Sequence, residues 1–84
     1  MRLPVIKHVV DFVEQNDEDW VVETIELLEH LAEAKGIKDE ELDVIGEILS
    51  NLYGSLEVVK QVKAGTSRKD ALNVFMKRVT GSIN

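Results

Sequence analysis

The sequence is short of several residue types, and each shortage excludes a class of structure or site. It has no cysteine, so a disulfide bond, a thiolate metal site and a cysteine nucleophile are all excluded. One proline and five glycines in 84 residues are too few for a loop-rich chain. With 31% charged and 44% hydrophobic residues, the composition indicates a globular domain with one core.

Long hydrophobic runs and the common catalytic motifs are also missing. The first twelve residues, MRLPVIKHVVDF, are interrupted by Lys7, His8 and Asp11, and no small-residue cleavage site follows them. They predict neither a membrane span nor a secretory signal, so we expect a cytoplasmic protein. The chain has no glycine-rich phosphate loop and no Gly-x-Ser-x-Gly elbow, so nucleotide chemistry and serine catalysis have no support.

Basic residues are few overall and concentrated at one end. The formal net charge is −6, but residues 60–84 hold six basic residues and one acidic residue, against four basic and fifteen acidic in residues 1–59. An acidic chain is not typical of a general nucleic-acid binder, because such binding depends on cations that neutralise phosphates. The basic end has three interpretations: pairing with the acidic first and second helices of the same chain, docking of an acidic partner, or nucleic-acid binding. We expect the first.

What the sequence does contain is helical periodicity. Apolar residues recur at helical spacing, and capping and stop residues separate four segments. We predict an all-α fold, a compact four-helix domain over residues 1–84 with helices at about residues 3–15, 17–34, 39–64 and 68–80. Gly36 should end the second helix and Gly65 the long central third helix, with the second and third helices forming an antiparallel hairpin.

Each helix has an apolar side that we expect to be buried. In the second helix this side is an arc of Trp20, Thr24, Ile25, Leu27, Leu28, Leu31 and Ala32, opposite a polar side with Glu23, Glu26, Glu29, His30 and Glu33. The acids and the histidine are metal-ligand types, but di-iron bundles use Glu-x-x-His pairs, and Leu27 stands three residues before His30. We therefore expect the acids to face solvent and to bind no metal, and we predict no cofactor. The third helix has a heptad-spaced seam of Leu42, Ile45, Leu49, Leu52, Leu56 and Val59.

The third helix also carries a stripe of small residues at every fourth position, Gly46, Ser50 and Gly54. Two glycines weaken a helix by about 1 kcal/mol each relative to alanine, so the stripe indicates close contact with another helix. The occupant is a helix of the same chain, which we favour, or a second copy or other protein, or a ligand. A hinge is less consistent, because a spacing of four keeps all three residues on one side.

Through the segments RLPVIKH, KDEELDVIGEILSNLYGSLEVVK and NVFMKRVTGSI, the chain resembles a family of short, uncharacterised proteins from Bacteroidetes. The resemblance implies a bacterial cytoplasmic setting and no established activity. The gene neighbourhood that it implies includes thioredoxin and peroxiredoxin genes, so thioredoxin-like proteins and peroxiredoxins are the partners it suggests.

A second resemblance covers residues 39–75, where DEELDVIGEILSNLYGSLEVVKQVKAGTSRKDAL is similar to the carboxymuconolactone decarboxylase and alkylhydroperoxidase D-like families. In those helical proteins an acid, a Cys-x-x-Cys pair and a histidine precede a Gly-x-Ser turn. The resemblance puts the acid at Asp43, the cysteines at Ser55 and Val58, and the histidine at Val62. Because thiol peroxidase chemistry needs a thiolate, it implies a shared fold without the activity.

These features favour a non-enzymatic protein that acts by binding another protein, with a homodimer as one form of this. One alternative is a redox or peroxide-stress accessory protein with a degenerate alkylhydroperoxidase D-like fold. The other is nucleic-acid binding through residues 60–84.

Overall fold

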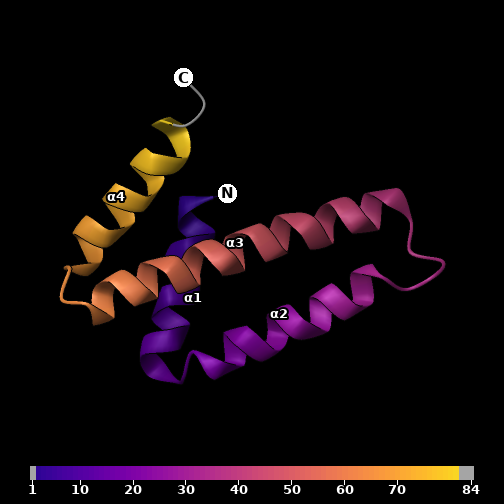
Figure 1. The fold of residues 1–84 in the computed structure, drawn as a ribbon, viewed down its shortest axis with the longest axis horizontal. Coiled ribbons are helices and arrows are strands. Elements are labelled where there is room, and N and C mark those ends of the chain that lie inside the picture. The colour runs from indigo at the N-terminus through magenta and orange to yellow at the C-terminus, as the bar shows by residue number, and fades with distance from the viewer. Residues whose placement is uncertain (1, 82–84) are drawn as a thin grey trace.

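The computed structural model describes residues 2–81, with side chains through residue 79, and these residues form four helices (Figure 1). The helices are α1 (Leu3–Gln15), α2 (Asp19–Ala32), α3 (Asp39–Lys63) and α4 (Arg68–Gly81). The all-α prediction with a long third helix is confirmed. α2 ends at Ala32, slightly before the predicted end.

Local sequence signals set the helix boundaries. Gly36 and Gly65 have φ angles of 89° and 108°, in the left-handed region that glycine adopts without steric cost. At the start of α4 the backbone N–H of Asp70 donates to Ser67 Oγ at 3.2 Å, so the Ser67 side chain caps the helix. The N–H of Asp19 donates to Asp17 Oδ1 at 3.1 Å and satisfies one free donor at the start of α2.

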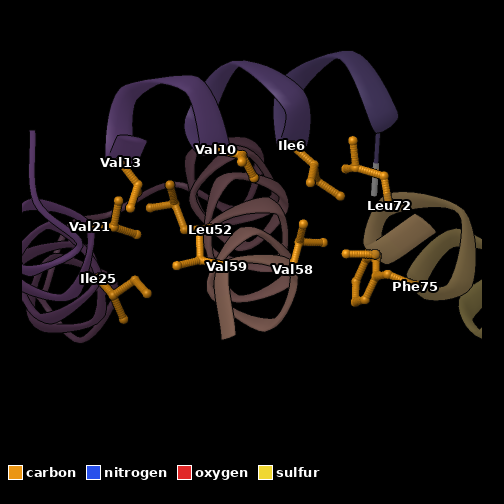
Figure 2. Close-up of a cluster of buried hydrophobic side chains, with 11 residues drawn as sticks. Ile6, Val10, Val13, Val21, Ile25, Leu52, Val58, Val59, Leu72 and Phe75 are labelled. Carbon is orange, nitrogen blue, oxygen red and sulfur yellow. The ribbon is translucent and has the colours of Figure 1, made fainter. Parts of the chain in front are cut away.

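The four helices form two layers. α2, α3 and α4 lie side by side, and α1 crosses over them on one face (Figure 2). α2 and α3 form the predicted antiparallel hairpin. Its closed end, where the turn around Gly36 joins the two helices, extends well beyond α1 (Figure 1). The principal extents of 43 × 35 × 17 Å correspond to a flat molecule two helices thick.

The hydrophobic core lies beneath α1, where it crosses the other three helices (Figure 2). Its buried members are Ile6, Val10, Val13, Val21, Ile25, Leu52, Val58, Val59, Ala71, Leu72 and Phe75. Ile6, Val10 and Val13 recur at a spacing of four and three, which puts them on one side of α1. The core is therefore built around α1 and the C-terminal half of α3.

One buried polar residue fixes the start of α1 on α3. Asn51 is 3% exposed, and its Oδ1 accepts from the backbone N–H of Arg2 at 2.8 Å. Its Nδ2 donates to the carbonyl oxygen of Glu47 at 2.8 Å, so both ends of the amide are satisfied. A buried amide with complete hydrogen bonding is tolerated in a core and specifies one geometry.

Candidate interaction surface

An apolar groove lies where α1 meets the α2–α3 hairpin. Val5, Val9 and Phe12 line it from α1, at a spacing of four and three that keeps them on one side of the helix. Trp20, Val21, Thr24 and Leu52 line it from α2 and α3, around a volume of about 460 Å³. The rings of Phe12 and Trp20 meet edge to face, with centroids 6.4 Å apart, yet Trp20 remains 60% exposed.

The apolar surface continues from this groove along α2. Trp20, Thr24, Leu27 and Leu31 follow at a spacing of four, three and four, so they form one ridge on the side of α2 that lines the groove. Leu27 is 63% exposed and Leu31 is 41% exposed. The uncovered ridge therefore runs from the groove toward the closed end of the hairpin.

This ridge corrects the predicted buried side of α2. The buried residues are Val21 and Ile25, with Leu28 and Ala32 half-buried, whereas Trp20, Thr24, Leu27 and Leu31 are exposed. The physical reason is that α2 packs mainly against one neighbour, α3, so only a narrow strip of it is covered. The sequence prediction assumed that the whole apolar arc would find a partner within the chain.

α3 adds a second uncovered ridge to the same side of the molecule. Val44 and Ile48 precede Leu52 at intervals of four, so the three residues lie on one side of α3. Leu52 lines the groove beside α1, and Val44 lines a second groove with Leu31 at the hairpin end. Val44 is 58% exposed and Ile48 is 42% exposed.

We call the combined surface the apolar face and define it by seven exposed residues: Val5, Phe12, Trp20, Leu27, Leu31, Val44 and Ile48. They are most of the large exposed hydrophobic residues among those the structure describes; the others are Val22, Leu42, Tyr53 and Val74. Exposed hydrophobic residues are usually scattered, so a concentration on one side indicates a binding surface. The sequence did contain a signal for it, because Val44 and Ile48 are apolar residues outside the predicted seam of α3.

The glycine–serine stripe lies on a different side of α3. Gly54 is buried and Ser50 is half-buried, but Gly46 is exposed, and a Cβ placed on it would meet nothing within 4 Å. Gly46 stands midway between Val44 and Ile48, so helical geometry turns it away from their ridge. Only the Gly54 end is covered within the chain, and an interface at the Gly46 end stays a prediction.

The acids along α2 and at its C-cap, Glu33, face solvent as the sequence predicted. Glu23, Glu26, Glu29 and Glu33 are exposed, and so is His30. Among residues 2–81, no three histidine or acidic side chains are grouped closely enough to hold a metal ion. One unpredicted contact crosses the hairpin here: the Tyr53 hydroxyl donates to Glu29 Oε2 at 2.6 Å, and this hydrogen bond raises the pKa of Tyr53 above 10.0.

The positions matched to the alkylhydroperoxidase D-like motif do not form a site in this chain. Ser55 and Val58 are fully buried, and the Ser55 hydroxyl donates to the carbonyl oxygen of Asn51 at 2.7 Å. Asp43 is exposed and lies about 18 Å from Ser55 along α3, given the rise of an α-helix. The acid and the two cysteine positions therefore do not meet at any one surface.

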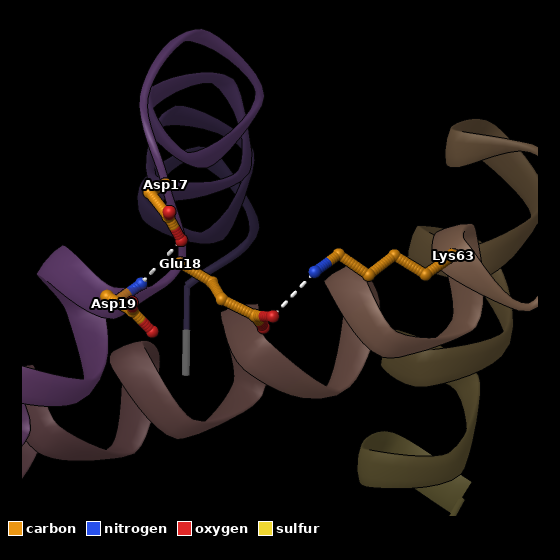
Figure 3. A network of polar contacts seen from close by, with 4 residues as sticks. All are labelled: Asp17, Glu18, Asp19 and Lys63. Carbon is orange, nitrogen blue, oxygen red and sulfur yellow. Dashed lines mark hydrogen bonds and ion pairs between the residues drawn. The ribbon is translucent and has the colours of Figure 1, made fainter.

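Several cations of the basic end pair with acids of the same chain, as expected. Lys63 Nζ lies 2.5 Å from Glu18 Oε1 (Figure 3), and this bond raises the pKa of Lys63 above 10.5. Arg68 pairs with Asp11 and Glu14 of α1, and it donates to the carbonyl oxygen of Lys7 at 3.1 Å. These ion pairs link the end of α3 and the start of α4 to the first two helices, and each contributes little to stability because it is exposed.

The chain as a whole matches one family. The model of a family of unknown function, DUF6952, matches residues 1–84. No curated protein and no solved structure matches the chain. No helix within residues 2–81 is both long and apolar enough to cross a membrane.

Proposed function

The chain belongs to DUF6952, and we propose that it acts by binding protein, without catalysing a reaction, and that the apolar face is its binding surface. The observation that carries this proposal is the concentration of seven large exposed hydrophobic side chains on one side of the molecule. Interface centres are apolar and depleted of charge, with aromatic residues enriched. Phe12 and Trp20 supply the aromatic part, beside the leucine ridge of α2.

A protein fits this surface better than a small molecule does. Small-molecule sites enclose most of the ligand and direct a few polar groups at it. Among the described residues that line the groove beside α1, the polar side chains are those of Thr24 and His8, and both are exposed. The hairpin ridges extend the apolar surface far beyond the reach of one small ligand.

The two alternative functions have less support. A redox accessory role would rest on the alkylhydroperoxidase D-like resemblance, in which buried Ser55 and Val58 replace the cysteines. Nucleic-acid binding would need free cations in residues 60–84, but Lys63, Arg68 and Arg78 are paired with the chain's own acids. Within a bacterial cytoplasm, the setting that the first resemblance implies, thioredoxin-like proteins and peroxiredoxins are the first foreign partners to test.

Affinity capture with matched baits tests the proposed function. We would immobilise the native chain, Leu27→Glu on the apolar face and Val74→Glu on α4, because Leu27 and Val74 are both 63% exposed. The native and Val74→Glu baits should retain the same proteins from a lysate of the parent organism, and Leu27→Glu should lose them. Identical sets on all three baits would contradict binding through the apolar face.

A further inference from the structure

The chain exposes more surface than a folded domain of its mass should. Its accessible surface is 5983 Å², whereas a monomer of 9.5 kDa is expected to expose roughly 5,050 Å². Its radius of gyration is 13.8 Å, against about 12 Å for a compact domain of this length. The surplus, about 900 Å², is close to the area of about 800 Å² that each partner buries in a standard protein interface.

α1 covers only part of the helix layer. α1 crosses the layer near the C-terminal half of α3, and no helix of residues 2–81 lies over the closed end of the hairpin on that side (Figure 1). Val5 and Phe12 are on the flank of α1, whereas Leu27, Leu31, Val44 and Ile48 are on the uncovered hairpin. The apolar face is therefore a step, with a raised half at α1 and a lower half at the hairpin end.

We propose that the occupant of the apolar face is a second copy of this chain, related by a two-fold axis. This proposal rests on the proposed function, because it identifies which protein binds at the apolar face. In a two-fold dimer both copies use the same patch. A two-fold rotation sets the raised half of each copy over the lower half of the other, so that the two α1 helices lie next to each other between the two hairpins.

Two properties of the face favour a second copy over a foreign partner. Under a two-fold rotation the raised half of one copy fits the lower half of the other, so a second copy has the shape that the face requires. Six of the eight residues that line the groove beside α1 are apolar, and interfaces of permanent homodimers are more hydrophobic than those of transient complexes. Glu40 and Glu41 border the face at the hairpin end, so a basic helical peptide is the competing occupant that the test must separate.

Sedimentation equilibrium of the purified chain tests this proposal. At micromolar concentrations the native chain should have twice the 9.5 kDa mass of one copy. Leu27→Glu and Val44→Glu should each weaken dimerisation by about a hundredfold or more, because each substitution occurs twice in a two-fold interface and charges its apolar centre. Val74→Glu should leave the dimer intact, and circular dichroism should show native helicity in all three variants.

The outcomes separate this proposal from the proposed function. A native chain that stays monomeric at every concentration overturns the second-copy proposal, and capture of a foreign protein that depends on Leu27 would then still support protein binding. A dimer that neither Leu27→Glu nor Val44→Glu weakens also overturns it, because the copies must then meet elsewhere. A monomer that binds a basic helical peptide through Leu27 assigns the face to the competing occupant.

Discussion

At the scale of single residues, two exposed polar contacts join α2 and its flanking turn to α3. Tyr53 reaches from α3 to Glu29 of α2, and Lys63 reaches from the end of α3 to Glu18 at the start of α2. Both contacts raise a pKa, that of Tyr53 above 10.0 and that of Lys63 above 10.5. A raised pKa means that the folded state favours the protonated form. These contributions to stability are therefore complete below pH 10 and are lost as the pH rises through the raised values.

We predict that Tyr53 titrates above pH 10.0 in the folded chain and that Glu29→Ala brings its pKa back toward 10.0. The hydrogen bond to Glu29 is the main cause of the shift, and the substitution removes both that bond and the nearby negative charge. Tyr53 is the chain's one tyrosine, so the ultraviolet absorbance of tyrosinate reports it directly. Glu26→Ala is the matched control on the same helix, and an identical titration in both variants would contradict the Tyr53–Glu29 contact.

At the scale of helices, the boundaries were predictable and the buried sides only partly so. The stops at Gly36 and Gly65 depend on one residue each, and local chemistry is enough to place them. The buried side of α2 depends on how many neighbours it has, which no residue of α2 encodes. Trp20 was expected in the core and is 60% exposed, although its ring meets that of Phe12 from α1 edge to face. The extra apolar residues of α3 were visible in the sequence, but their exposure, and so the candidate surface, depends on packing between helices.

The two glycines of the α3 stripe should respond in opposite ways to the same substitution. Gly46→Leu should raise the free energy of unfolding by about 0.5–1 kcal/mol, because leucine forms helix better than glycine and Gly46 faces open space. Gly54 is buried, so Gly54→Leu should lower it by about 1–3 kcal/mol through overpacking. Urea unfolding of both variants measures the difference. A destabilising Gly46→Leu that also changes the molecular mass would instead place Gly46 in an interface.

At the scale of the whole molecule, charge and apolar surface act in opposite directions on association. Each copy carries a formal net charge of −6, so two copies repel each other at long range. Burial of the apolar face does not depend on charge and is the term that holds the proposed dimer together. The net charge of −6 already includes Lys63, Arg68 and Arg78, which pair with acids of their own chain.

We therefore predict that added salt strengthens the dimer. Raising sodium chloride shortens the range of the repulsion between the two acidic copies and leaves apolar contacts in place. The dissociation constant measured by sedimentation should fall as salt increases from low to physiological concentration, with Val74→Glu behaving like the native chain. For a basic peptide, the dissociation constant should instead rise with added salt, because salt screens the attraction between the peptide and the acidic chain. A dimer that salt weakens would show that ion pairs between the copies, and not the apolar face, dominate their association.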